Sequence, residues 1–141
     1  MGATAGEERS LEVPAQIYEA MMAHSRFSYP EEACGLLAAD DEGRLRMVYC
    51  LTNADHSSSS YTIEPTEHFR ALRHAESHGW ELAGAFHSHP HSAAFPSITD
   101  LRLAAEPDWI YLVVGLAGTP ELRGFSLRSG TINEVVLRVV G

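Results

Sequence analysis

The sequence contains no lysine: all ten basic residues are arginine, against 19 acidic residues, and the net charge is −9. Nucleic-acid-binding domains need a basic stripe that follows the phosphates, so this balance argues against that class of protein. Cysteine is also scarce. Cys34 and Cys50 are the only two, which excludes a disulfide framework and favours a reducing, cytoplasmic environment.

Long apolar runs are missing as well. The longest clear run, Trp109 to Leu116, is far shorter than the roughly 18 to 20 residues that a membrane-spanning helix needs. No basic segment followed by an apolar one stands near the start, so we expect no secretory signal peptide.

The zinc-deaminase pattern, His-x-Glu with Pro-Cys-x-x-Cys, is absent too, which disfavours base deamination. We therefore expect neither a nucleic acid nor a membrane as partner.

The chain is long enough for one compact domain. Its 141 residues, with 45% hydrophobic and 21% charged residues, are ordinary for a globular protein. Residues 1–9 are small and polar, and we expect a loose N-terminus there. Residues 10–141 are then the single domain.

Hydrophobic periodicity predicts ten elements in the order β-α-β-β-α-β-α-β-β-β. We expect helices over residues 14–25, 65–78 and 97–105, and strands over residues 11–13, 33–39, 45–51, 82–88, 109–116, 122–127 and 132–140. The second helix carries Phe69, Leu72 and either Ala75 or Glu76 at helical spacing, which predicts that they lie on its inner face. This order indicates an α/β domain with a mixed central sheet between helices.

Two histidines stand on the expected strand over residues 82–88 and at its end. Side chains alternate between the faces of a strand, so His87 and His89 share one face while Ser88 points away and supports the strand. Two imidazoles on one face can converge on a single cation. Pro90 cannot donate to the sheet, so the strand is expected to end there.

A hydroxyl and a carboxylate follow shortly after, at Ser97 and Asp100, where the third helix is expected to begin. Asp100, in the first turn, can turn back toward the histidines as a third ligand. Three protein ligands with an open fourth position are typical of a catalytic zinc site. The sequence therefore predicts one zinc ion held by His87, His89 and Asp100.

Each of these features also has an ordinary structural interpretation. Ser97-x-x-Asp100 before an apolar run is a helix capping box, and two histidines at this spacing can form a solvated strand face. Either feature alone favours the ordinary interpretation. Their joint occurrence along one strand, loop and helix favours the metal site.

The pattern His87-Ser88-His89-Pro90, six further residues and Ser97-x-x-Asp100 resembles the metal motif of the JAMM (MPN-plus) metallopeptidase family. The segment from Tyr29 to Leu37 resembles that family's catalytic-glutamate segment, and the likeness extends over residues 11–140. The residues alone do not separate Glu31 from Glu32; the resemblance selects Glu32 as the general base. It also implies a single three-layer JAMM/MPN fold related to the cytidine-deaminase architecture.

The resemblance implies zinc-dependent hydrolysis of an amide bond. Glu32 is expected to take the proton of the attacking water, and zinc with the Ser97 hydroxyl is expected to stabilise the oxyanion. The short, insertion-free chain looks most like bacterial members that act at the C-terminus of ubiquitin-like sulfur-carrier proteins. Release of cysteine from a carrier–cysteine adduct is the first expectation, and trimming of residues that mask the diglycine is the second.

Two alternatives remain open from the sequence. The same fold occurs in family members that have lost the ligands and serve as interaction scaffolds, although such a scaffold has no need of the complete ligand set. A thiol hydrolase that uses Cys34 is the other alternative. Cys34 lies within an apolar strand, where thiols are usually inert.

Overall fold

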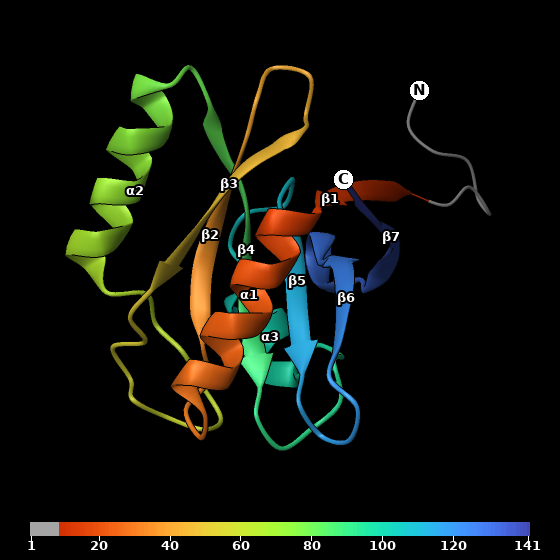
Figure 1. The fold of residues 1–141 in the computed structure, drawn as a ribbon. Coiled ribbons are helices and arrows are strands. Elements are labelled where there is room, and N and C mark those ends of the chain that lie inside the picture. The colour runs from red at the N-terminus through yellow and green to blue at the C-terminus, as the bar shows by residue number, and fades with distance from the viewer. Residues whose placement is uncertain (1–8) are drawn as a thin grey trace.

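The computed structural model describes residues 9–141; the loose N-terminus expected over residues 1–9 lies, except for Arg9, outside the described residues. Figure 1 shows a sheet with helices on both of its faces. The strands are β1 (Ser10–Pro14), β2 (Cys34–Ala39), β3 (Leu45–Leu51), β4 (Glu81–His89), β5 (Ile110–Gly115), β6 (Glu121–Ser126) and β7 (Asn133–Val140). The helices are α1 (Ala15–Ser28), α2 (Pro65–Ser77), α3 (Ile98–Leu103) and the short 3₁₀ turn η1 (Arg128–Gly130). The predicted order of elements is confirmed.

The sheet has seven strands in the order β1-β7-β6-β5-β4-β2-β3. The pairs β1–β7 and β4–β5 are parallel and the other pairs are antiparallel, so the sheet is mixed, as predicted. All residues of β5 are buried, because a central strand is covered on both faces. None of the described helices is long and apolar enough to span a membrane.

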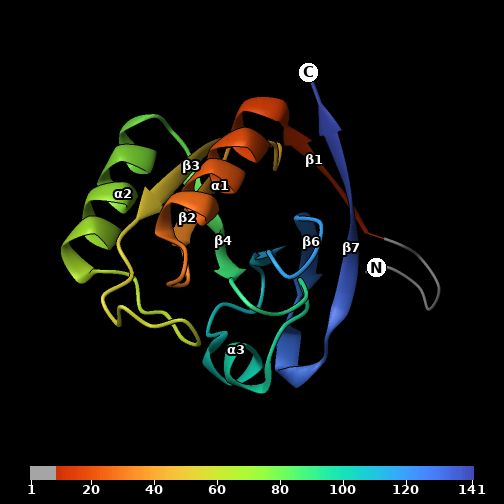
Figure 2. The same ribbon diagram turned by 60° about the horizontal axis from the view of Figure 1, so that its bottom comes forward.

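Strand alternation divides the core into two clusters, one on each face of the sheet. On one face, Met21 of α1 packs with Phe86 of β4 and Leu112 of β5. On the other face, Ala71 of α2 packs with Ala85 of β4. Figure 2 shows α1 and α3 on opposite sides of the sheet, so the domain has three layers.

The inner face of α2 differs from the prediction. Ala71 and Ala75 are its buried residues, with 3% and 0% of their surface exposed, whereas 57% of Phe69 is exposed. Small side chains therefore face the sheet, where Ala71 packs with Ala85 of β4. Periodicity identified the helix correctly and the expectation for Ala75 is confirmed, but the choice of Phe69 for the inner face was wrong.

Two helix boundaries also differ from the expected ones. The first helix continues to Ser28, three residues beyond the expected end, and the third ends at Leu103 rather than at residue 105. Ala104 adopts an extended backbone (φ −72°, ψ 97°), which ends α3. The resulting short α3 places its first turn directly over the end of β4.

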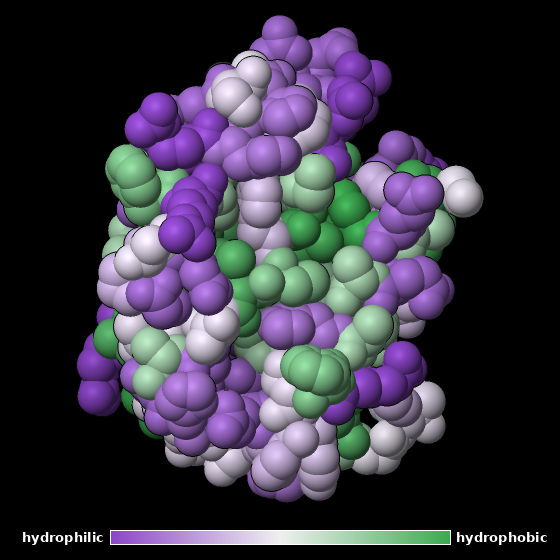
Figure 3. All heavy atoms as spheres, turned by 60° about the vertical axis from the view of Figure 1, so that its left-hand side comes forward, coloured by the Kyte–Doolittle hydropathy of each residue, from purple (hydrophilic) through white to green (hydrophobic). Residues whose placement is uncertain are grey.

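Hydrophobic residues gather on the side of the molecule that carries α2 and the edge strand β3, where Figure 3 shows an apolar hollow surrounded by hydrophilic residues. A groove of about 360 Å³ lies on this side between the two elements, and Tyr49, Leu51, Ala71 and His74 line it together with two charged residues. It shares no lining residue with the cavities around His87 described below.

Candidate metal centre

The two histidines of β4 project from the same face of the sheet, toward α3. Only 3% of His87 and 5% of His89 is exposed. The strand that carries them lies inside the sheet, between β2 and β5. The strand ends at His89, directly before Pro90, as predicted. Nδ1 of His89 lies 2.9 Å from the carbonyl oxygen of Ala93. When Nδ1–H donates to that oxygen, Nε2 is left as the basic nitrogen that faces the site.

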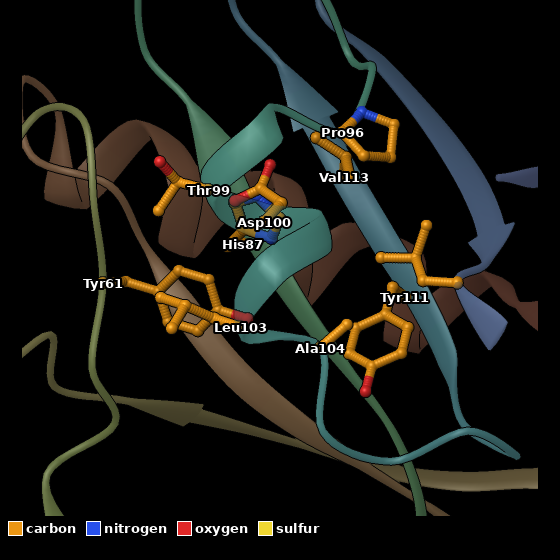
Figure 4. Close-up of a pocket in the computed structure, with 10 residues that line it drawn as sticks. Tyr61, His87, Pro96, Thr99, Asp100, Leu103, Ala104, Tyr111 and Val113 are labelled. Carbon is orange, nitrogen blue, oxygen red and sulfur yellow. The ribbon is translucent and has the colours of Figure 1, made fainter. Parts of the chain in front are cut away.

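Asp100 reaches the two imidazoles from the first turn of α3. Its Oδ2 atom lies 3.0 Å from Nε2 of His87 and 3.0 Å from Nε2 of His89, and the two nitrogens are 3.1 Å apart. Figure 4 shows the Asp100 carboxylate beside the His87 ring. The structure therefore brings the three predicted donor residues together on one compact triangle of atoms.

The capping box at Ser97 exists as well. Oγ of Ser97 accepts the N–H of Asp100 at 3.0 Å, and Oδ2 of Asp100 accepts the N–H of Ser97 at 2.8 Å. The ordinary interpretation of this motif is thus correct, and it is compatible with a metal site because the cap itself orients the carboxylate toward the histidines. The cap also leaves the proton of the Ser97 hydroxyl available for donation.

Hydrogen bonding and burial act together on the charges of the site. Burial lowers the pKa of His87, against the opposing effect of Asp100. Burial alone would lower the pKa of His89, but its hydrogen bonds to Asp100 and Ala93 raise it above the ordinary value. Burial would raise the pKa of Asp100, but the hydrogen bonds from both histidines hold it far below its usual range. Asp100 is accordingly an ionised carboxylate, the form that binds a metal.

The donor set fits a zinc ion by its size as well as by its chemistry. Ligands at about 2.0–2.1 Å in a tetrahedral arrangement lie about 3.3–3.4 Å from one another, and the three donor atoms here are separated by 3.0 to 3.1 Å. Two imidazoles and one carboxylate are common zinc ligands, and a set of three leaves the fourth position open. These residues could therefore hold a catalytic zinc ion.

Glu32 lies immediately before the start of β2 and is buried, with 4% of its surface exposed. Its Oε1 atom is the one buried side-chain oxygen or nitrogen without a hydrogen-bond partner among the residues that the structure describes. Burial raises the pKa of Glu32 from 4.5 to about 7, while His89 acts in the opposite direction. A buried carboxyl with an unused oxygen and a pKa near neutrality is suited to proton transfer.

Ser88 connects the histidine strand to the backbone beside Glu32. Its Oγ atom accepts the N–H of Ala33 at 2.8 Å, and its own N–H donates to the Ala33 carbonyl at 3.0 Å. The expectation that Ser88 points away from the metal site and supports the strand is confirmed. The side chain between the two histidines thus fixes the residue that follows Glu32.

The sequence analysis missed Tyr61, which lies at the end of the polar loop between β3 and α2. Its ring stacks on the His87 ring, with centroids 4.7 Å apart and an interplanar angle of 23°. Figure 4 shows the side chain reaching in toward His87 and Leu103. Tyr61, Leu103 and Tyr111 line both a small cavity of about 40 Å³ beside His87 and a larger one of about 500 Å³. The one signal in the sequence is a single aromatic residue after four serines.

Cys34 does not have the environment of a nucleophile. Its side chain is fully buried, and burial raises the pKa of its thiol to about 12. Catalytic cysteines instead have a lowered pKa and partial exposure. The thiol-hydrolase alternative is therefore not supported by the structure.

Comparison with known proteins identifies the family. Residues 14–128 match the family of prokaryotic homologs of the JAB domain. The chain belongs to that family. It is 34% identical over 133 residues to the CysO-cysteine peptidase of Mycobacterium tuberculosis, which covers 92% of this chain and 91% of that protein. It is also 34% identical over 131 residues to a probable TtuB-protein conjugate cleaving protease of Thermus thermophilus, covering 92% of this chain and 83% of that protein.

Solved structures agree with the family assignment. A protein of Desulfitobacterium hafniense, known from its solution structure, has a TM-score of 0.84 and 33% identity, with 92% of each chain covered. A JAB1/MPN domain protein of Archaeoglobus fulgidus has a TM-score of 0.60 at 17% identity, covering 92% of this chain and 98% of that one, and so shows the shared fold. The JAMM resemblance and the three-layer fold are confirmed. The chain is a JAB-family peptidase, and the scaffold alternative receives no support.

Proposed function

We propose that this peptidase uses one zinc ion to hydrolyse the amide bond at the C-terminus of a ubiquitin-like sulfur-carrier protein. The observation that carries the proposal is the convergence of His87, His89 and Asp100, within hydrogen-bond distance of one another, in a site that also holds a buried carboxyl with an unused oxygen. The names of two relatives, which act on CysO-cysteine and on TtuB-protein conjugates, supply the substrate class.

In this proposal His87, His89 and Asp100 hold the zinc ion. When bound, zinc polarises the scissile carbonyl and lowers the pKa of water at the site from 15.7 toward about 7. Glu32 accepts the proton of the attacking water and passes it to the departing amine. The Ser97 hydroxyl donates a hydrogen bond to the oxyanion that develops on the carbonyl, since its Oγ already accepts from Asp100 and its proton is unused.

The cavities beside the site support a substrate with a flexible, glycine-ended tail. The cavity of about 40 Å³ beside His87 has no room for a large side chain, whereas the one of about 500 Å³ that shares Tyr61, Leu103 and Tyr111 has room for an extended segment. The carrier tail would lie in the larger cavity, and its terminal glycines would pass the three shared residues. Cysteine is our first choice for the leaving group, and a masking peptide is the second.

The test uses purified zinc-loaded protein and CysO carrying a C-terminal cysteine. Mass spectrometry should show loss of one cysteine residue from the carrier, and a chelator should stop the loss. Glu32→Gln should bind zinc as the unchanged protein does and release no cysteine. If the zinc-loaded protein leaves both this adduct and a carrier with a masked diglycine intact, the proposed substrate class is wrong.

A further inference from the structure

The loop between β3 and α2 is attached to the backbone of Glu32 through one side chain. Asn53 is buried, with 6% of its surface exposed. Its Nδ2 atom donates to the carbonyl oxygen of Glu32 at 3.1 Å, and also to those of Ser60 at 3.0 Å and Ser57 at 3.5 Å. The two protons of this buried amide are thus shared among three carbonyl oxygens, one on Glu32 and two in the loop.

The other end of the same side chain closes the loop. Oδ1 of Asn53 accepts the N–H of Asp55 at 3.0 Å and that of Thr62 at 3.2 Å. Two further backbone contacts stand beside it: the N–H of Ala54 donates to the Thr62 carbonyl at 2.8 Å, and Asn53 forms a β-bridge with Ile63. Asn53 therefore occupies the inside of the loop and joins its two ends, and Tyr61, which stacks on His87, lies in the closed segment.

Glu32 depends on its backbone for its position. Its Oε1 atom makes no hydrogen bond within the described part of the chain, so that atom has no contact of this kind to orient the carboxyl. On one side the Glu32 N–H donates to the Ser57 carbonyl at 2.8 Å, and on the other Ser88 holds Ala33. Ser57, which accepts the Glu32 N–H, and Asn53, which donates to the Glu32 carbonyl, both belong to the loop that Asn53 closes.

We propose that Asn53 is the positioning residue of the site: its amide holds the Glu32 backbone and closes the loop that carries Tyr61. This inference rests on the proposed role of Glu32 as the general base. Asn53 does not touch the reacting atoms and acts through Glu32. Loss of its donors deprives the buried Glu32 carbonyl and the partly buried Ser60 carbonyl of this hydrogen bond and lets the Glu32 carboxyl shift, while the three donor atoms on β4 and α3 keep their own contacts.

The sharpest variant is Asn53→Asp, which keeps the size of the side chain and the Oδ1 acceptor but removes the two donor protons. Asn133→Asp, at the exposed start of β7, introduces the same charge and is the matched control. Zinc content, kcat and KM on the CysO–cysteine adduct, and hydrogen exchange of the Glu32 amide are measured for each. For Asn53→Asp we expect full zinc content, a KM within about threefold, and a kcat lowered about tenfold to a hundredfold, the scale of a misplaced catalytic group.

Hydrogen exchange keeps the inference testable without a substrate. In the unchanged protein the Glu32 amide should exchange far more slowly than the exposed amide of Asp41, and Asn53→Asp should accelerate it at least tenfold while Asn133→Asp leaves it unchanged. A zinc-loaded Asn53→Asp protein with unaltered kcat would overturn the inference. Rapid exchange of the Glu32 amide in the unchanged protein would also overturn the inference. This measurement does not depend on whether the variant folds. Slow exchange together with an uncleaved adduct would instead count against the proposed substrate only.

Discussion

Ser88 and Ala33 exchange two hydrogen bonds, one from the Ala33 N–H to the Ser88 Oγ at 2.8 Å and one from the Ser88 N–H to the Ala33 carbonyl at 3.0 Å. The residue between the two histidines is therefore joined to the residue after Glu32, although they lie 55 positions apart in the chain. These backbone and hydroxyl contacts fix the position of Glu32 relative to the two histidines. They do so without a direct contact between the carboxyl group and the imidazoles.

Replacement of one imidazole should remove the metal. His89→Ala deletes one of the three donors, and we expect elemental analysis of the purified variant to show less than about a tenth of the zinc in the unchanged protein, because two ligands hold zinc far more weakly than three. His91→Ala is the matched control, since His91 is exposed and lies outside the donor triangle. Full zinc occupancy in His89→Ala would show that the proposed ligand set is wrong.

Variants of Ser97 should separate its two roles. Ser97→Ala removes both the cap and the hydroxyl, and we expect a loss of about 1 kcal/mol in the free energy of unfolding and of about 10²–10³ in kcat. Ser97→Gly should cost only a few tenths of a kcal/mol, because glycine is tolerated as an N-cap, yet lose as much kcat. Ser97→Thr should retain most of both. Normal turnover in Ser97→Gly would leave Ser97 with its capping role alone.

In the metal-free protein, the contribution of Glu32 to stability should fall as the pH rises. Burial raises the pKa of Glu32 from 4.5 to about 7, so the folded state holds a proton that the unfolded state releases between these values. The Glu32 contribution to the free energy of unfolding should therefore fall between pH 4.5 and 7, by up to about 3 kcal/mol at 1.36 kcal/mol per pKa unit, and stay level above pH 7. In Glu32→Gln this contribution should be absent. Urea unfolding of both metal-free proteins at several pH values measures the difference, and identical slopes would contradict it.

The sequence predicted the three metal donors His87, His89 and Asp100 because they lie close together in the chain. Strand alternation puts His87 and His89 on one face, and a short loop returns Asp100 to them. Glu32 could be selected only through the family resemblance, since nothing in its own segment distinguishes it from Glu31. The structure separates the two by burial: Glu32 is buried beside the site, whereas Glu31 is partly exposed and contacts His56.

The parts that the sequence did not predict depend on contacts without a periodic pattern. Asn53 and Tyr61 lie in a polar loop, and their roles come from contacts to Glu32 and His87 that lie more than 20 positions away in the chain. Periodicity also led to Phe69 rather than Ala71 as an inner residue of α2, because it ranks residues by hydrophobicity and takes no account of how closely a helix approaches a sheet.

The position of β4 inside the sheet has a consequence for local opening. Its backbone is paired on both sides with β2 and β5, so His87 and His89 can separate only when the centre of the domain comes apart. The loop that carries Tyr61 is instead joined to its surroundings by side-chain and single backbone contacts, among them those of Asn53 and Ser57 to Glu32 and the stacking of Tyr61 on His87. Local fluctuations that leave the sheet intact should therefore leave the spacing of the two Nε2 atoms unchanged.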